Sequence, residues 1–447
     1  MCGDEVFLGF DPTVSLNDNG DVVSIVVRGT KSKVTYIVDQ KLHVATGLTG
    51  RCTRVWQAHS STDPKQSVII KDAWPSVAKA SKESEMLARL KDVTGVPNVI
   101  TAITVKTWEY GDKPKADTFD TTDRVRREIA PSNYRTRKHR RLVMGTLGIK
   151  VHHFETLSEL IGAFQDVIAA HRDACARGVL HRDISLNNIM LQGTSPNRKG
   201  LLIDFDHALY QQKNDTYGRK AVDVIDDNDI NSSLAPPGSP VKTVAVLEDA
   251  QVASKRKRTI QESGTMLDDV QLAMEQTGTP LFIATALLLG TELHQDKHDL
   301  ESIFYAFLYA LMAFKGPGAT RNKADFLALP SMPAILDWFD LNVMQTCFSK
   351  MAHIKMGHFC DFERTFIKKM DPYFNQLHPF IRSLFAATFT DNHCDRSHLD
   401  HNLMLNLFNT EYERLLALEK EEEDEGRPRK HAKTDKSKIR GSSNLLP

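Results

Sequence analysis

The segment HRDISLNNIML, residues 181–191, contains residue types that suit phosphoryl transfer. Asp183 can accept the proton of an incoming hydroxyl group, and Asn188, five residues later, can hold Mg²⁺ beside the transferring phosphate. The apolar residues that follow predict a strand that holds the end of this loop in place. The pattern His-Arg-Asp-x-x-x-x-Asn therefore makes Asp183 the candidate catalytic base, preceded by His181 and Arg182.

The same triplet occurs ten residues earlier, at His171-Arg172-Asp173, and both copies cannot hold one catalytic role. Apolar residues repeat at helical spacing over residues 157–175, so we predict that the first copy lies inside an amphipathic helix. His171 falls on the apolar stripe of this helix, whereas the carboxylate of Asp173 faces solvent. Gly178 can end the helix in a left-handed conformation. We therefore assign the chemistry to the second copy.

Two further segments supply charges that a phosphate-transfer site needs. In GLLIDFDHAL an apolar strand ends at Asp204, whose carboxylate can chelate Mg²⁺, while Phe205 packs inside. In the N-terminal part, VIIK ends at Lys71, which we expect on the third strand and which can bind the α- and β-phosphates of ATP. This lysine needs a carboxylate partner on the next helix, and Glu83 has the suitable spacing, with Glu85 as the alternative.

The segment GLTGRCTRVW is the weakest candidate for a phosphate-covering loop. Gly47 and Gly50 can let the backbone approach phosphates, but Cys52 stands where a second loop glycine is expected. Val55 would cover the adenine ring. ATP and Mg²⁺ are therefore the predicted ligands, with the glycine loop as the least specific part of the site.

The elements that must position these residues divide the chain into two parts. Residues 1–148 are rich in β-branched stretches bounded by turn residues, which predicts a small sheet, with one main helix over residues 77–90 and a polar surface loop over residues 110–138. Helical periodicity dominates residues 149–418, and the segment 298–316 is apolar nearly all round, as in a buried helix. We therefore predict an α+β fold, with a β-rich N-lobe and a larger helical C-lobe.

Two segments stand apart from these lobes, and one motif within the C-lobe needs a separate interpretation. Residues 210–270 are polar and predict an insertion, and residues 419–447 predict a charged, disordered tail. Basic runs in both segments are compatible with a nuclear address. The segment HCDRSHLDHN contains His393, Cys394, His398 and His401. Because a second cysteine pair is missing, we interpret it as a polar loop rather than a metal site.

Taken in order, the motifs resemble those of the eukaryotic protein kinase fold. More narrowly, VLHRDISLNNIML, LLIDFDHAL, GTPLFIA and HDLESIFYAFLYAL resemble the fungal-type protein kinase family, over most of residues 30–390. The resemblance implies two lobes with ATP in the cleft between them, Ser/Thr phosphotransfer to a protein substrate, and a role inside a fungal cell. It also implies that Asn188 and Asp204 hold Mg²⁺, that the backbone of Met144 contacts adenine, and that Asp299 binds the catalytic-loop backbone.

The sequence departs from the general kinase pattern at several positions. Ser185 replaces a lysine near the γ-phosphate, which removes one stabiliser of the transition state. Asp206 replaces the glycine of Asp-Phe-Gly, whose backbone angles Asp adopts only at some cost. Residues 284–286 replace Ala-Pro-Glu, so the usual Glu–Arg ion pair is absent. Thr277 and Thr279 are candidate sites for activating phosphorylation.

The bulk composition predicts an intracellular protein, cytoplasmic and/or nuclear. The 447 residues carry a formal net charge of zero, so no overall field draws the chain to nucleic acid or to an anionic membrane. The six cysteines are scattered, which favours a reduced compartment. No apolar run reaches the roughly 18 residues that a membrane span needs, and we predict neither a secretory signal nor N-myristoylation.

Three functions remain compatible with these features. The first is an active Ser/Thr protein kinase, the second a catalytically weak or inactive pseudokinase that acts as a scaffold, and the third a small-molecule phosphotransferase. The long segment before GTPLFIA favours a protein kinase over the third function. The presence of Lys71, Asp183, Asn188 and Asp204 favours activity, whereas the weak glycine loop and the altered Ala-Pro-Glu segment favour a scaffold.

Overall fold

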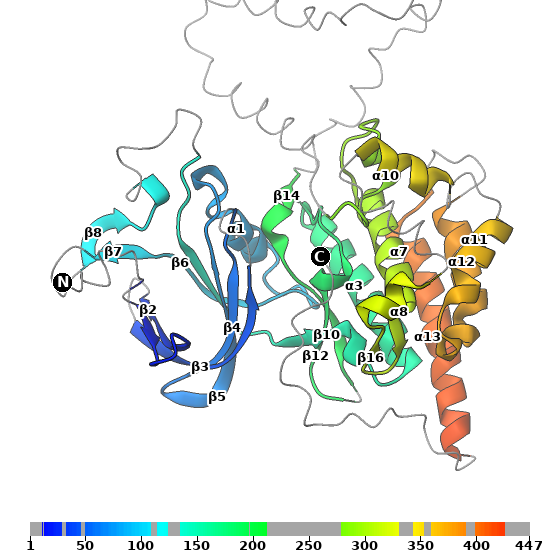
Figure 1. Cartoon of the computed structure of the whole chain (residues 1–447), viewed down its shortest axis with the longest axis horizontal. Helices are drawn as coiled ribbons and strands as arrows, with labels where there is room; N and C mark the ends of the chain where they lie inside the picture. Colours follow the sequence, from blue (N-terminus) through cyan, green and yellow to red (C-terminus); the bar gives the residue numbers. More distant parts are fainter. Residues whose placement is uncertain are drawn as a thin grey trace, which may run out of the picture.

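The N-terminal part of the chain is a curled β-sheet and the C-terminal part is mainly helical, as the computed structural model shows (Figure 1). This is the α+β class expected from the sequence. The structure describes residues 11, 13–28, 33–45, 50–108, 114–123, 135–195, 197–211, 279–329, 343–352, 359–389 and 398–424. The predicted insertion therefore lies outside the described residues from residue 212 onward.

The N-terminal sheet has seven strands in the order β1-β2-β3-β4-β5-β9-β6, and every neighbouring pair is antiparallel. Its strands are β1 (Val14–Leu16), β2 (Val22–Arg28), β3 (Lys33–Val44), β4 (Arg54–Ser60), β5 (Asp63–Ala73), β6 (Val99–Thr104) and β9 (Arg140–Met144). Because β1 and β2 extend one edge, Lys71 lies on the fifth strand of the chain and not on the third, as the sequence analysis expected.

Strand β5 separates two apolar clusters. Val68 and Ile70 belong to a cluster on one face of the sheet, whereas Ile69 belongs to the main core on the other face. Successive side chains of a strand point to opposite faces, so Lys71 shares the face of Ile69. In the neighbouring strands, Val55 pairs with Lys71 and Met144 pairs with Ile69. This register brings Val55, Lys71 and Met144 to one face of the sheet.

Two N-terminal segments differ from the predicted secondary structure. The loop expected over residues 110–138 is wrong in part, because β8 (Pro114–Phe119) lies within it and pairs with the preceding strand β7 (Lys106–Trp108). The predicted helix is shorter than expected: α1 spans Lys82–Arg89 and follows a 3-10 turn. Leu90 closes α1, and the left-handed backbone of Asp92, with φ of 70°, prevents the helix from continuing beyond it.

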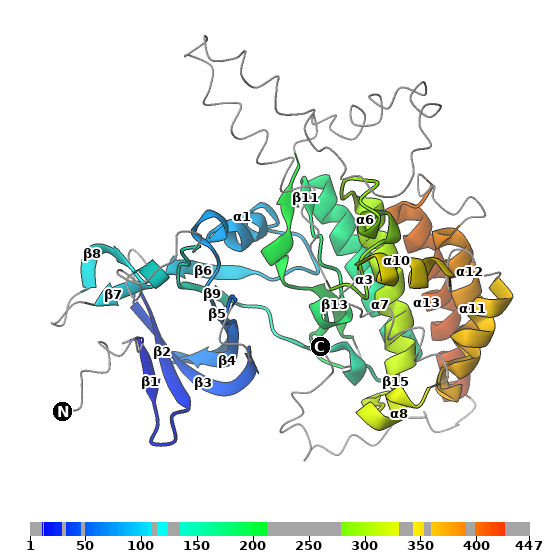
Figure 2. The same ribbon diagram turned by 45° about the horizontal axis from the view of Figure 1, so that its top comes forward.

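The helices of the C-terminal part pack around one apolar core (Figures 1 and 2). They are α3 (Leu157–Ala176), α6 (Thr285–Leu288), α7 (Asp296–Ala313), α8 (Lys323–Leu327), α10 (Val343–Lys350), α11 (Phe359–Thr365), α12 (His378–Thr388) and α13 (His401–Asp424). Thr156 caps α3 by accepting a hydrogen bond from the backbone of Glu159. Helix α7 is buried nearly all round, as its apolar sequence predicts. Helix α13 continues to Asp424, past residue 419, where the tail was expected to begin.

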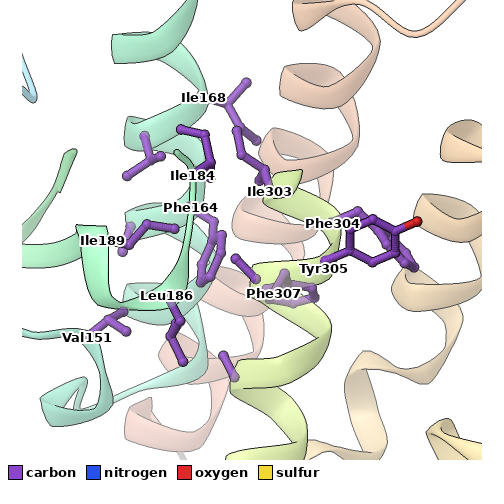
Figure 3. Close-up of a cluster of buried hydrophobic side chains, with 14 of the residues drawn as sticks. Val151, Phe164, Ile168, Ile184, Leu186, Ile189, Ile303, Phe304, Tyr305 and Phe307 are labelled. Carbon is purple, nitrogen blue, oxygen red and sulfur yellow. The ribbon is translucent and has the colours of Figure 1, made fainter. Parts of the chain in front are cut away.

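The core holds the predicted catalytic segment between two of these helices. Figure 3 shows Ile184, Leu186 and Ile189 from this segment beside Phe164 of α3 and Ile303 of α7. All five side chains are at most 9% exposed, so the loop rests on closely packed apolar groups. Dense packing of this kind limits backbone movement and fixes where the polar side chains of the loop can lie.

Two short pairs of antiparallel strands position the predicted metal-binding residues, Asn188 and Asp204. Strand β12 (Ile189–Gln192) pairs with β13 (Lys199–Leu202), and Ile189 lies opposite Leu202. Asn188 directly precedes β12 and Asp204 follows β13, so both leave this hairpin at the same end. Strand β11 (Val179–Leu180) pairs with β14 (Leu209–Tyr210), which closes the segment around them. Within the described part of the chain, no helix has both the length and the apolar character needed to cross a membrane.

Candidate active site

Asp183 and Asn188 are held together by the turn between them. Residues Leu186–Asn188 form a 3-10 turn, and the side-chain amide of Asn188 donates a hydrogen bond to the backbone carbonyl of Asp183 at 2.8 Å. The backbone of Asn188 also donates to the carbonyl of Ser185 at 3.0 Å. The spacing of five residues therefore folds back on itself and places the Asn188 amide beside Asp183, as the motif predicts.

Asp299 anchors the backbone of this loop. Its Oδ2 accepts the backbone N–H of Arg182 at 3.0 Å, the contact that the resemblance implied. Arg182 has φ of 70°, a strained value for a residue with a side chain, and the bond helps to stabilise it. The same oxygen lies 2.9 Å from Nε2 of His171, and Oδ1 lies 2.8 Å from Nε2 of His294. Burial alone would raise the pKa of Asp299, but the two histidines hold it well below its usual range.

His181 connects the catalytic loop to the strand before Asp204. Burial lowers the pKa of His181 to about 4, so the ring is neutral. Its Nε2 donates to the carbonyl of Ile203 at 3.0 Å, and its Nδ1 accepts the backbone N–H of Asp183 at 3.2 Å. The ring also meets Phe205 edge to face, with centroids 4.7 Å apart. His181 is therefore a positioning residue in this site.

Lys71 lies at the centre of three carboxylates. Its Nζ donates to Oε1 of Glu83 at 2.8 Å, to Oδ1 of Asp204 at 2.8 Å and to Oδ2 of Asp206 at 3.1 Å, which matches the three donors of an ammonium group. Burial opposes its charge, but Asp204 and Glu83 raise the pKa of Lys71 well above its usual range. Glu83 is thus the partner of Lys71, as predicted, whereas the alternative Glu85 is exposed.

The residue that replaces glycine in Asp-Phe-Gly does not carry the expected backbone cost. Asp206 lies in a 3-10 turn, Phe205–His207, and the left-handed residue is Asp204, with φ of 67°. The carboxylate of Asp206 instead faces Lys71 and Arg51. Burial opposes ionisation, but these two cations hold the pKa of Asp206 well below its usual range. The exchange of glycine for aspartate therefore adds a charge to the site and does not strain this turn.

The carboxyl group of Asp183 has an environment that suits proton transfer. Burial, and then the negative charge of Asp204, raise the pKa of Asp183 to about 7. The backbone N–H of Thr279 donates to Oδ1 of Asp183 at 3.2 Å. A shallow recess, lined in part by Asp183, Thr279 and Phe282, opens beside it. A phosphate on Thr279 would place negative charge against Asp183, which argues against activation at this residue. Thr277 lies outside the described residues.

The nucleotide-facing residues predicted on the sheet share the face of Lys71. Val55 packs against the main core, and Met144, at the end of β9, is 9% exposed. The next residue, Gly145, donates its backbone N–H to the carbonyl of Asn98 at 2.9 Å. Gly50 has φ of 91°, which a glycine adopts without strain, whereas Gly47 lies outside the described residues. The adenine contacts of Val55 and Met144 stay predictions.

The segment that replaces Ala-Pro-Glu is anchored by residues that the sequence analysis did not single out. The backbone N–H and the hydroxyl of Thr285 donate to Oε1 of Glu301 at 3.1 and 2.7 Å, and the hydroxyl of Tyr305 donates to it at 2.7 Å. Lys350 donates to the carbonyls of Pro280 and Ile283 at 3.1 and 2.7 Å. In the sequence, the charged residue Glu301 within the apolar helix α7 could have indicated that α7 makes such a contact. These contacts anchor the segment, which is the task that the Glu–Arg ion pair of the general kinase pattern would perform.

The carboxylate of Asp204 is the kind of hard oxygen ligand that Mg²⁺ prefers. Oxygen atoms of Glu83, Asp204 and Asp206 lie within 4.8 Å of one another, but Lys71 binds all three carboxylates, so Asn188 and Asp204 stay the predicted ligands. Of the histidines of HCDRSHLDHN, His398 binds the carbonyl of Ala387, whereas Nε2 of His401 lies 2.9 Å from Nδ1 of His171. His401 thus forms a close group with His171 and Cys175, outside its own segment, with ligand atoms within 4.8 Å of one another. His393 and Cys394 lie outside the described residues.

A sheet-bound lysine, a carboxylate-rich hairpin end and the buried loop with Asp183 and Asn188 are the main parts of this site. The sequence matches the family described as fungal protein kinase over residues 1–222 and 245–311, which is more than half of the chain. The chain therefore belongs to the fungal protein kinase family, as the motifs suggested. No curated protein matches the chain.

Proposed function

We propose that the protein is an ATP-dependent protein kinase that transfers the γ-phosphate of ATP to serine and threonine hydroxyl groups of a protein substrate. The observation that carries this proposal is the position of Lys71, bonded at 2.8 Å both to Glu83 of α1 and to Asp204 beyond β13. These bonds join the sheet to the hairpin that carries Asn188. Phosphate-binding and metal-binding groups therefore lie at one place.

The residues of the site support distinct roles in this reaction. Lys71 would bind the α- and β-phosphates, and Asn188 and Asp204 would hold Mg²⁺, which when bound neutralises negative charge on the phosphates. Asp183 would accept the proton of the attacking hydroxyl group. Its pKa of about 7 suits this task, because a general base works best with a pKa near the pH at which it operates.

The surroundings of Asp183 leave room for a protein hydroxyl group as acceptor. A recess lined in part by Asp183 and Phe282 opens beside the base, and serine or threonine as acceptors is what the resemblance to the fungal-type protein kinase family implies. Thr285 and Lys350 fix the adjoining segment, 279–286, to α7 and α10. A fixed segment next to the base is a suitable surface for a protein substrate. Action in the cytoplasm or the nucleus remains part of this proposal.

A nucleotide-binding scaffold is the second candidate, because Ser185 leaves the catalytic loop without its usual lysine. Transfer of radiolabelled phosphate from Mg-ATP to a generic protein substrate, or to the protein itself, separates the two functions. We expect transfer by the wild-type protein and by Asp173→Ala, whose carboxylate is 47% exposed, and none by Asp183→Ala. Tight Mg-ATP binding by calorimetry without any transfer by the wild-type protein would instead favour the scaffold.

A further inference from the structure

The catalytic loop has no cation of its own at position 185. Ser185 is 3% exposed, and its carbonyl oxygen accepts the backbone N–H of Asn188 at 3.0 Å. Charge that develops on a transferring phosphoryl group needs a positive partner held near the base. A side chain from elsewhere in the chain must supply that charge if the protein transfers phosphate.

Arg51 is a positive side chain at the edge of this site. It follows Gly50, with φ of 91°, and precedes Cys52, with φ of 47°, so the backbone reverses its direction around it. The guanidinium group reaches across from the sheet to the hairpin end and pairs with Oδ2 of Asp206. Cys52 thus takes a left-handed conformation at the position where a glycine was expected, and the loop still turns.

The charges around Arg51 are those of the phosphate site. Burial opposes its charge, but Asp206, Asp204 and Glu83 raise the pKa of Arg51, and Asp183 adds to this effect. Lys71 binds the same oxygen of Asp206 at 3.1 Å, so the two cations flank one carboxylate. The Arg51 side chain is 36% exposed. Asp206, with a side chain 13% exposed, is bonded to Lys71 as well, so it keeps a cation when the guanidinium group turns to another anion.

We propose that Arg51 contacts the γ-phosphate of ATP and takes the electrostatic role that a lysine at position 185 would have, with Asp206 as its partner when no nucleotide is bound. The inference rests on the proposed kinase function. A guanidinium group is suited to this task, because it stays charged and offers paired N–H donors to phosphate oxygens. Lys71 is bonded to Glu83 and Asp204, whereas Arg51 is paired with Asp206 and partly exposed, which suits Arg51 to the terminal phosphate.

The preference for ATP over ADP, measured by calorimetry with Mg²⁺, tests this contact without any turnover. Only ATP has the γ-phosphate, so Arg51→Met should weaken ATP binding by about 10-fold to 100-fold and leave ADP binding nearly unchanged. Arg54→Met is the matched control, because Arg54 is exposed on β4 and lies outside the site. An unchanged ratio of ATP to ADP affinity in Arg51→Met, or a loss shared equally by both nucleotides, overturns the proposal.

Phosphate transfer provides a second measurement. Arg51→Met should lower kcat by about 10-fold or more, and adding Ser185→Lys to it should restore part of the rate. Thermal unfolding of each variant shows whether the buried position 185 accepts lysine, and the affinity ratio decides the proposal if it does not. A wild-type protein that prefers ATP through Arg51 but transfers no phosphate would contradict the kinase function and leave the Arg51 contact standing.

Discussion

Nε2 of His171 lies 2.9 Å from Oδ2 of Asp299, the oxygen that also accepts the backbone N–H of Arg182. A single carboxylate oxygen therefore joins the two His-Arg-Asp triplets. We predict no catalytic role for the first triplet, yet its histidine supports the loop that contains the second. His171 is fully buried, and its Nδ1 lies 2.9 Å from Nε2 of His401, so a chain of polar contacts runs from α13 to the catalytic loop.

Replacing His171 should weaken both the fold and the catalytic loop. In His171→Leu the buried carboxylate of Asp299 loses one partner and keeps His294, so we expect the free energy of unfolding to fall by about 3 kcal/mol. Phosphate transfer should lose kcat more than KM, because the loop geometry changes while the nucleotide contacts remain. Urea unfolding and initial rates measure the two effects. Asp173→Ala is the control, and a loss of similar size there would contradict the assignment of the two triplets.

The transfer rate should depend on pH through Asp183. A base must be deprotonated to accept a proton, and burial together with Asp204 raises the pKa of Asp183 to about 7. We therefore expect kcat/KM to fall about tenfold for each pH unit below this value. Initial rates between about pH 5.5 and pH 8.5 test this, with circular dichroism to verify that the fold persists. A profile that stays flat down to about pH 5 rules out a raised pKa at the base.

Replacing Lys71 should leave three carboxylates without their shared cation. Lys71→Met should abolish detectable ATP binding and lower the free energy of unfolding by about 3 kcal/mol at pH 7.5. Burial and the neighbouring charge of Asp206 raise the pKa of Glu83 well above its usual range, so Glu83 takes up a proton easily. The stability difference from wild type should therefore shrink toward about pH 5. Lys91→Met, at an exposed position, is the control for calorimetry and urea unfolding.

A buried network behind Lys71 should make stability fall at high pH. His139 lies between Asp72, at 3.0 Å, and Asp120, at 3.3 Å, and Arg141 binds Asp72 at 2.7 Å. Burial opposes its charge, but Asp120 and Asp72 raise the pKa of His139 to about 9. A raised histidine pKa stabilises the fold fully below the unfolded value of about 6.5, and this contribution is lost as the pH rises through about 9.

The size of this effect can be measured by difference. This shift in the pKa of His139 contributes on the order of 3 kcal/mol to the free energy of unfolding. The wild-type protein should lose that much stability between about pH 6.5 and pH 9.5, beyond any loss in His139→Gln. Urea unfolding at both pH values measures it, and the comparison removes contributions from other groups, His171 among them. Equal losses in the two proteins would show that His139 carries no extra charge in the folded state.

The local patterns of the sequence predicted much of the fold. Helices α3, α7, α12 and α13 follow from apolar residues at helical spacing, and β2 to β5 follow from runs of β-branched residues. Where tertiary contacts decide the outcome, these patterns were insufficient. The end of α1 depends on the backbone of Asp92, and the β7–β8 hairpin formed inside a segment whose charge suggested a loop.

The motif residues were predictable because each motif is short and folds on itself. The contact of Asn188 with Asp183 follows from the turn between them, and Glu83 reaches Lys71 because a strand leads directly to a helix. The contacts of Arg51 with Asp206, of Thr285 with Glu301 and of His171 with His401 were decided only by the tertiary structure. Each contact joins residues that lie far apart in the sequence, and no helical or strand periodicity links them. These residues meet only after the sheet, the loop and the helices have packed together. The sequence by itself thus determined which residues could carry the chemistry, and the packing of the two parts decided which charges surround them.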